Sequence, residues 1–273
     1  MISVSNVSYS YQGSHRKVFD KFSLSFSEDG IYGLLGRNGT GKSTLLYLMS
    51  GLLRPSSGSV SVDGFNAFQR SPEMLSDIFL VPDTVYFPDC TLRSYISSNG
   101  CFYPRFSEEL LRKCLSDFGM DTDVRLSALS FGQKKKVLVS FAIATGVHWL
   151  FMDEPANGLD IPSQSLFRKI IADSIEPGRS LILSTHQVHG IENLLDHVVI
   201  IDGSRVLVNA GTGDITSRYR FLNVRAGDAV PVLYSEPSAM GSRAIVRRDS
   251  GDGETILDLE LFFNAVISGK IVM

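Results

Sequence analysis

A glycine-rich segment has the residue types and spacing of a phosphate-binding loop. It matches GxxxxGK[ST], and it lies between a buried-strand pattern and the helical pattern STLLYLMSGLL. Glycines let successive N–H groups point at phosphate oxygens, and the helix N-terminus adds partial positive charge. Lys42 can bridge the β- and γ-phosphates, and the Ser43 hydroxyl can ligate Mg²⁺. The alternative, a turn capped by Ser43, is disfavoured because every fixed position is met. The predicted nucleotide-binding residues are Gly36, Arg37, Asn38, Gly39, Thr40, Gly41, Lys42, Ser43 and Thr44.

Two adjacent carboxylates follow another apolar run, Leu150-Phe151-Met152. Asp153 can hold the metal through water, and Glu154 can orient or deprotonate an attacking water. Taken alone, an Asp-Glu pair at the end of a strand is more often a turn or a helix N-cap. Its meaning depends on the motifs around it.

A histidine ends a third apolar run in the same way. His186 follows Ser184 and Thr185, and an isolated histidine at this place is more often structural or exposed. His189 suggests a metal pair as an alternative, but the sequence offers no further Cys or carboxylate at matching spacing.

The apolar runs that precede these groups predict the elements that position them. Residues 31–35, 150–152 and 181–183 lack alternation, which indicates strands buried on both faces, and ligands bind beyond the carboxyl ends of such strands. Alternating residues near Ile2, Phe22 and Val60 predict a flanking antiparallel layer. Residues 84–144 have helical patterning and predict an inserted helical subdomain. Residues 216–273 predict a small α/β extension.

The order of motifs resembles the ATP-binding-cassette (ABC) family. Its members carry a Walker A loop, a glutamine loop, an LSGGQ-like signature, an Asp-Glu strand, a D-loop and a switch histidine. Residues 1–215 follow this order except at the glutamine loop, and Leu129-Ser130-Phe131-Gly132-Gln133 is the most specific match. The resemblance implies the P-loop NTPase fold of an ABC nucleotide-binding domain, with a mostly parallel core sheet, an antiparallel β layer and the helical insertion.

The resemblance also implies a shared active site. The signature of one subunit covers ATP held by the other, in a homodimer or in a heterodimer with a second cassette. Ser130, Gly132 and Gln133 would contact the partner's ATP, although Ser followed three residues later by Gln is also a plain N-cap. Asp160 would link the two sites, His186 would sense the γ-phosphate, and Tyr11 would stack on adenine. Tyr9 is the runner-up, and either tyrosine could instead be a strand aromatic.

Asp83 stands where the family usually has glutamine. A carboxylate can ligate Mg²⁺, but it adds negative charge beside the γ-phosphate, so slower or more coupling-dependent hydrolysis is expected. The alternative is a Pro-Asp turn.

The resemblance implies an ATPase that binds and hydrolyses MgATP and powers a separate transmembrane permease. The spacing from YPRF and FGM to LSFGQ resembles bacterial exporter-type ATPases. Aromatics in VYFPDCTLRSYI and CFYPRF are either a surface that docks the permease or the core of the helical subdomain. The alternative function is a soluble ABC ATPase in a non-transport process. An inactive regulatory cassette is disfavoured because Lys42, Asp153, Glu154 and His186 are all in place.

Composition limits the remaining classes of function. The net charge is −3 and the pI is about 6.0, so no nucleic-acid partner is expected. Lys134, Lys135 and Lys136 are interpreted as a solvated face or as charge near phosphate, and the three cysteines as reduced thiols. No apolar run approaches the roughly 20 residues of a membrane span. We therefore expect a cytoplasmic protein, peripheral on the inner face of the membrane through a permease.

Overall fold

The structure is a computed structural model that describes residues 1–14, 16–27, 29–186, 190–225, 230–239, 241–249, 251–253 and 255–273. The strands are β1 (Ile2–Tyr9), β2 (Phe19–Phe26), β3 (Gly30–Leu35), β4 (Ser57–Val62), β5 (Phe65–Asn66), β6 (Ile78–Val81), β7 (Trp149–Asp153), β8 (Ser180–Thr185), β9 (His197–Asp202), β10 (Arg205–Gly211), β11 (Tyr219–Val224), β12 (Val232–Ser238) and β13 (Gly241–Arg247). The α-helices are α1 (Lys42–Met49), α2 (Pro72–Leu75), α3 (Leu92–Asn99), α4 (Glu108–Asp117), α5 (Phe131–Ala144), α6 (Ile161–Ser174), α7 (Thr212–Arg218) and α8 (Leu259–Ile267). Short 3₁₀ turns are η1 (Ala67–Gln69), η2 (Gly100–Phe102), η3 (Leu126–Ala128) and η4 (Glu192–Leu194).

The central sheet has the strand order β10-β9-β3-β8-β7-β6 within the described residues. All its pairs are parallel except β10 with β9. Leu35 pairs with Thr185, and Asp153 pairs with Ser184, so the carboxyl ends of β3, β7 and β8 meet at one edge. This register brings the segments that carry the predicted chemistry together.

The two faces of the central sheet are covered by different elements. Tyr32 and Leu34 of β3 face a core that contains α1 and the antiparallel sheet β2-β1-β4-β5. Ile31 and Leu35 face the opposite core, which contains α5 and α6. Helix α1 therefore lies between the two sheets, and alternate residues of each buried strand support a different layer.

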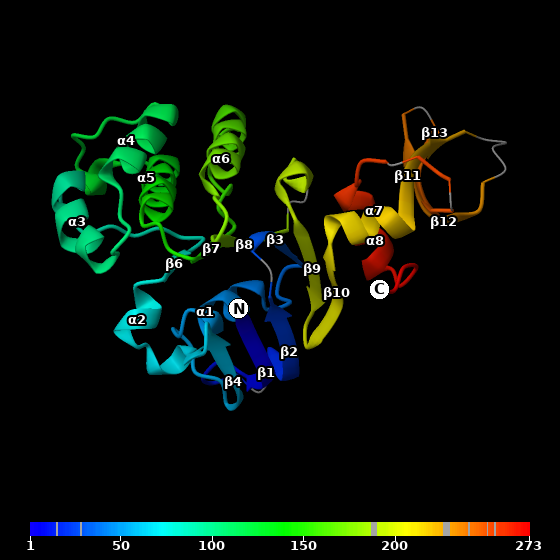
Figure 1. The fold of residues 1–273 in the computed structure, drawn as a ribbon, viewed down its shortest axis with the longest axis horizontal. Helices are drawn as coiled ribbons and strands as arrows, with labels where there is room; N and C mark the ends of the chain where they lie inside the picture. Colours follow the sequence, from blue (N-terminus) through cyan, green and yellow to red (C-terminus); the bar gives the residue numbers. More distant parts are fainter. Residues whose placement is uncertain are drawn as a thin grey trace.

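The helical insertion packs around its own apolar core. Helices α3, α4 and α5 contribute residues to this core, and Phe141 of α5 lies at its centre, in ring contact with Phe79, Tyr95, Tyr103 and Phe106. Figure 1 shows α3, α4 and α5 grouped at one end of the molecule, away from the antiparallel sheet.

The C-terminal residues form an antiparallel sheet, β11-β13-β12, with α8 packed against it. Figure 1 shows this unit at the opposite end from α3 and α4. The predicted fold class is confirmed, including the small α/β extension. The predicted boundary after residue 215 falls inside α7, and the division into domains 1–215 and 216–273 stays a prediction.

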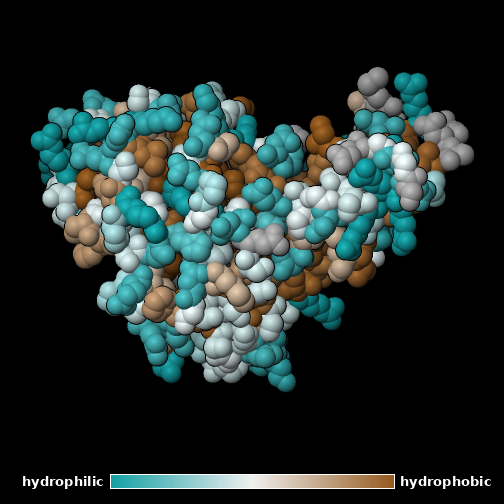
Figure 2. Space-filling view, in the orientation of Figure 1, coloured by the Kyte–Doolittle hydropathy of each residue, from teal (hydrophilic) through white to brown (hydrophobic). Residues whose placement is uncertain are grey.

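Polar side chains predominate on the face shown in Figure 2, where apolar groups show through in small patches. Among the helices of the described residues, none is long and apolar enough to cross a membrane.

Candidate functional site

The glycine-rich loop lies between β3 and α1, as predicted. Gly41 precedes α1 with φ +103°, and a Cβ at this position would lie 2.6 Å from the Phe19 ring. Only glycine combines this backbone conformation with so close an approach. Lys42 Nζ donates to the carbonyl oxygens of Gly36 at 2.8 Å and Arg37 at 3.3 Å, so the ammonium is folded back onto its own loop.

Lys42 is almost fully buried within the loop. Burial lowers the pKa of Lys42, and the negative charges of Glu154 and Asp153 oppose this effect. The lysine is thus a poorly solvated donor beside two carboxylates. Phosphate oxygens can replace the two carbonyl acceptors at little cost in desolvation.

The acidic pair ends β7 in two different environments. Asp153 is buried, and its Oδ1 accepts a hydrogen bond from the Ser184 hydroxyl of β8. Glu154 follows with φ 44°, in the left-handed region, which directs its side chain toward the end of β8. There Thr185 Oγ1 donates to Glu154 Oε2 at 3.2 Å.

His186 contacts Glu154 directly. Its backbone N–H donates to Glu154 Oε1 at 3.0 Å, and its Nδ1 lies 2.7 Å from the same oxygen. The structure therefore brings the predicted switch histidine and the predicted base into one hydrogen-bonded pair. His189, the alternative metal partner of His186, lies outside the described residues.

Asp83 is connected to the D-loop, Asn157-Gly158-Leu159-Asp160, and to α5, the helix that begins within the signature. Asn157 Nδ2 donates to Asp83 Oδ1 at 3.1 Å. Lys135 of α5 is fully buried, with 0% of its surface exposed, and its Nζ donates to the carbonyl oxygens of Pro82 at 3.0 Å and Asp83 at 2.7 Å. The interpretation of Lys135 as part of a solvated face is wrong, because α5 turns this side chain under the loop that follows β6.

Tyr11 stands at the edge of the loop, and Tyr9 does not. Tyr11 is 45% exposed, and its hydroxyl lies 3.0 Å from Thr44 Oγ1. Tyr9 is buried, and its ring meets the ring of Tyr11 edge-on at 5.1 Å. Of the two tyrosines considered for adenine stacking, only Tyr11 presents a ring to the site.

These groups enclose a cavity of about 470 Å³. The cavity is bordered by Tyr11, Val18, Asn38, Gly39, Gly41, Lys42, Ser43, Thr44, Asp83, Glu154, Asn157 and His186.

 

The ten predicted positions among these twelve come from segments far apart in the chain, and Val18 and Asn157 are the two that the prediction missed. Val18 gave no signal, because a single valine beside a strand is ordinary. Asn157 belongs to the segment Asn157-Gly158-Leu159-Asp160, so the D-loop match could have identified it.

Gly36, Arg37 and Thr40 belong to the same loop but do not border the cavity. They act from behind it: Thr40 Oγ1 donates to the Arg37 carbonyl at 2.8 Å, and both Gly36 and Arg37 accept from Lys42. Asp153 is likewise buried behind the cavity wall.

The signature residues do not border this cavity. Ser130 caps α5: its Oγ accepts from the Gln133 N–H at 3.3 Å, and Gln133 Oε1 accepts from the Ser130 N–H at 2.9 Å. The capping box that was the alternative interpretation is therefore present. Asp160 caps α6 by accepting from the Ser163 N–H at 3.0 Å.

The signature packs against the D-loop of its own chain. A Cβ at Gly132 would lie 2.7 Å from the Gly158 carbonyl oxygen, and a Cβ at Gly158 would lie 2.3 Å from the Phe131 ring. These close approaches keep the N-terminus of α5 and the segment after Glu154 in a single arrangement. The structure thus separates the predicted site residues into a loop side and a signature side.

Comparison with known proteins identifies relatives over most of the chain. A family profile described as ABC transporter matches residues 19–157. A putative ABC transporter ATP-binding protein of Pyrococcus furiosus is 31% identical over 219 residues, which cover 76% of this chain and 82% of that protein. The bacitracin transport ATP-binding protein BcrA of Bacillus licheniformis is 29% identical, over 71% of this chain and 65% of that protein. A solved structure of an ATP-binding subunit of an ABC transporter has the same fold, with a TM-score of 0.69 at 24% identity, over 79% of this chain and 91% of that chain.

Proposed function

Because this chain belongs to the ABC transporter ATP-binding family, we propose that two copies of it close head to tail around two MgATP molecules and drive a separate membrane permease. That the chain is an ATP-binding ATPase follows from the family itself. The head-to-tail dimer, the magnesium site and the role of each residue are the parts that we propose. The bacitracin transport protein among the relatives is consistent with the exporter-type resemblance.

The separation of the loop side from the signature side is the observation that carries the dimer. The cavity is bordered by the glycine-rich loop, Asp83, Glu154 and His186, and by none of the signature residues. Ser130 and Gln133 lie at the surface, at the N-terminus of α5, where backbone N–H groups and the helix dipole favour an anion. A second copy that presents this end to the cavity supplies donors to the γ-phosphate that one chain alone does not bring there.

The oxygen ligands at the cavity suit MgATP. Ser43 and Asp83 border the cavity and Asp153 lies behind its wall, so together they provide a hydroxyl and two carboxylates, the oxygen ligands that Mg²⁺ prefers. Magnesium, when bound, neutralises charge on the β- and γ-phosphate oxygens. Lys42 has exchangeable carbonyl partners and is placed to donate to the same phosphates.

Glu154 and His186 are placed to act on the attacking water and on the γ-phosphate. Two hydrogen bonds from His186 and one from Thr185 fix the carboxylate of Glu154 before substrate arrives. A carboxylate held in this way orients a water and accepts its proton without further reorganisation. We assign Glu154 as the base and His186 as the residue that positions it and contacts the γ-phosphate.

An apolar groove of about 850 Å³ supports a permease partner. It lies where η2 approaches α2 and β6, and its apolar lining includes Leu52, Phe79, Phe102 and Tyr103. Phe102 is 66% exposed, whereas Phe79 and Tyr103 pack into the helical core. Tyr103 of the segment CFYPRF thus belongs to the core of the helical subdomain, whereas Phe102 of the same segment is available to a partner. We propose that a helix of the permease occupies this groove and holds the ATPase at the inner face of the membrane.

A variant that binds ATP but hydrolyses it slowly tests the dimer. We expect Glu154→Gln with MgATP to elute as a dimer in size-exclusion chromatography, and the same variant with MgADP to elute as a monomer. A Glu154→Gln protein that stays monomeric with MgATP would overturn the proposed mechanism.

Complementation tests whether the site is shared. Lys42→Ala removes the loop lysine and Ser130→Ala removes the signature hydroxyl, so each protein alone should lose most activity. In a head-to-tail heterodimer of the two, one site keeps both residues, and we expect the mixture to recover ATPase activity. If the activity of the mixture is only the sum of the activities of the two variants alone, both residues belong to a site within one subunit.

The groove is tested by its most exposed aromatic. We expect Phe102→Asp to abolish association with a permease encoded beside this chain while leaving the basal ATPase rate unchanged. Tyr86→Asp is the control, because Tyr86 is 86% exposed and does not border the groove. If both variants lose the permease equally, or if both still bind it, the assignment of the groove is contradicted.

A further inference from the structure

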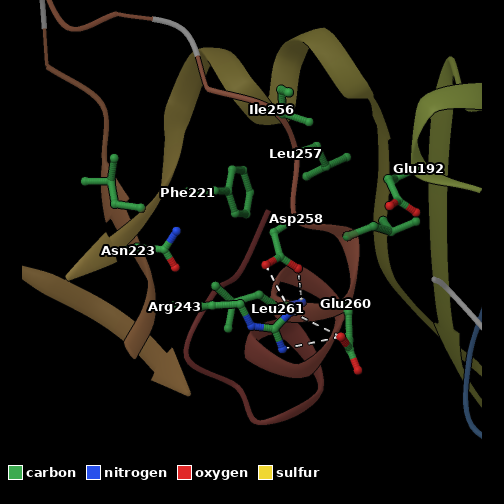
Figure 3. Close-up of a pocket in the computed structure, with 11 residues that line it drawn as sticks. Glu192, Phe221, Asn223, Arg243, Ile256, Leu257, Asp258, Glu260 and Leu261 are labelled. Atoms are coloured by element: carbon green, nitrogen blue, oxygen red, sulfur yellow. Dashed lines mark hydrogen bonds and ion pairs between the residues drawn. The ribbon is translucent and has the colours of Figure 1, made fainter. Parts of the chain in front are cut away.

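A second cavity lies in the C-terminal unit, away from the nucleotide site. It has a volume of about 320 Å³ and is bordered by β11, by β13, by residues 256–258 and by the first turn of α8. Glu192 of η4 completes its wall, so the cavity joins the C-terminal unit to the rest of the chain (Figure 3). Its volume is at the lower end of the range of small-molecule sites.

The charged groups of this cavity are predominantly carboxylates. Arg243 Nη1 donates to Asp258 Oδ2 and to Glu260 Oε2, each at 3.2 Å, and its Nη2 donates to Glu236 Oε2 at 3.2 Å. The guanidinium is thus already shared among three carboxylates. A bound anion would have to displace these ion pairs, so Arg243 does not make this an anion site.

Glu192 adds a further carboxylate to the wall of the cavity. Its Oε2 is buried and has no hydrogen-bond partner among the described residues. A buried carboxylate oxygen without a partner is costly, and a cation nearby relieves that cost. The border of the cavity therefore carries three carboxylates, from Glu192, Asp258 and Glu260, and one guanidinium that is already paired.

Apolar groups form the remainder of the wall. Figure 3 shows the ring of Phe221 directed into the cavity, near Ile256 and Leu257. Ile256 is 81% exposed, and the Phe221 ring rests edge-on against Phe262 at a centroid distance of 6.4 Å. An aromatic ring beside carboxylates favours a ligand that is both apolar and positively charged.

We propose that this cavity binds a small organic cation, an amine with an apolar body. The apolar part lies against Phe221 and Ile256, and the ammonium group faces the carboxylates of Glu192 and Glu260. Glu192 follows His186 in the chain with only residues 187–191 between them. Because Glu192 is close to His186 in the sequence, we expect an occupied cavity to modulate ATP turnover. This coupling rests on the proposed role of His186, whereas the binding itself does not.

Three probes with one skeleton test the class of ligand. Phenethylammonium, phenethyl alcohol and 3-phenylpropionate share a phenylalkyl body and differ in the charge of the head group. In titrations of the full chain followed by ¹H–¹⁵N NMR, we expect phenethylammonium to shift resonances of Phe221, Asn223 and Glu192, and the alcohol to bind at least fivefold more weakly. Equal binding of the anion, or no saturable shift with the amine, would overturn the proposal.

Two substitutions test the role of charge in the site. Glu192→Gln removes one carboxylate, and we expect the amine to bind about threefold to fivefold more weakly, as for one partly exposed charge pair. Asn223→Asp adds a carboxylate at an exposed position on the border and should strengthen binding by a similar factor. Glu109→Gln is the control, because it makes the same change on the distant helix α4. Unchanged affinity in both border variants would refute the site.

The ATPase rate separates binding from coupling. We expect saturating phenethylammonium to change the rate of the wild-type chain and to leave the rate of Glu192→Gln less affected. If the amine binds as expected but the wild-type rate does not change, the coupling to His186 is refuted and the binding site stands.

Discussion

Replacing Lys135 by Met tests the connection between the signature helix and the loop that carries Asp83. The ammonium is fully buried and donates to the carbonyl oxygens of Pro82 and Asp83. Burial lowers the pKa of Lys135, and the charges of Asp83, Asp153 and Glu154 oppose this effect. Methionine fills a similar volume but donates no hydrogen bond, so two carbonyl groups lose their charged donor.

The expected cost is large for a single side chain. A buried acceptor without a partner costs about 1 to 3 kcal/mol, and two carbonyl groups lose their donor. Part of this cost is offset because the variant no longer has to bury a charged ammonium group. We expect a net loss of about 2 kcal/mol, which corresponds to a fall in melting temperature of roughly 4–8 °C for a chain of this size. Thermal unfolding followed by circular dichroism measures this change.

Lys134→Met provides a matched control on the same helix. Lys134 is only half-buried, and its substitution should change stability by less than about 0.5 kcal/mol. A stable Lys135→Met protein, or equal effects at the two positions, would refute the assigned role of the buried lysine.

A double-mutant cycle separates the two contributions of Lys135. The bonds to backbone carbonyls are the same whatever side chain stands at position 83, but the attraction between charges is not. In an Asp83→Asn background we expect Lys135→Met to cost at least 0.5 kcal/mol less, the smallest coupling typical of neighbouring groups. Strict additivity would mean that the carbonyl bonds alone account for the effect. ATPase rates of the same four proteins show whether the loop position limits hydrolysis.

Three further results are expected. Asp83→Gln, which introduces the glutamine usual in the family, should raise the hydrolysis rate and change its magnesium dependence; an unchanged rate and metal profile would refute the effect of the carboxylate. Gly158→Ala adds a Cβ 2.3 Å from the Phe131 ring of the signature and should lower both the melting temperature and the ATPase activity. Gly178 has a similar φ but open space around it, so Gly178→Ala should cost only the backbone strain of about 1 to 2 kcal/mol. Equal losses of stability in the two variants would contradict the contact. Burial raises the pKa of Cys114 to about 11, so its thiol is protonated at pH 8. We expect mass spectrometry to find iodoacetamide on the exposed Cys101 of the native protein and on Cys114 only after unfolding. Comparable labelling of the two cysteines in the native protein would contradict this.

Much of the fold and of the nucleotide site could be predicted from the sequence, because short-range patterns determine these parts. Residues 31–35 had to form a buried strand, and GxxxxGK[ST] had to follow it as a turn into a helix, because apolar runs and glycine spacing act within a few residues. The order of the later motifs then placed Glu154 and His186 at the same sheet edge, where the register of β7 and β8 brings them together.

The environment of each side chain was decided only by the tertiary structure. Lys135 looked solvated beside two other lysines, and it is buried because α5 packs against the loop after β6. Tyr11 was predicted to stack on adenine with Tyr9 as the runner-up, and either could have been a strand aromatic. The pairing of β1 with β2 buries Tyr9, whereas Tyr11 lies beside Thr44.

The same limit applies to the two halves of the predicted site. Motif order could name Ser130 and Lys42 as parts of one chemistry, but it could not show that a single chain keeps the signature away from the loop cavity. Sequence determines which groups are available and the local backbone that presents them. Distances between groups far apart in the chain depend on how the layers pack, and packing joins residues that have no local pattern in common.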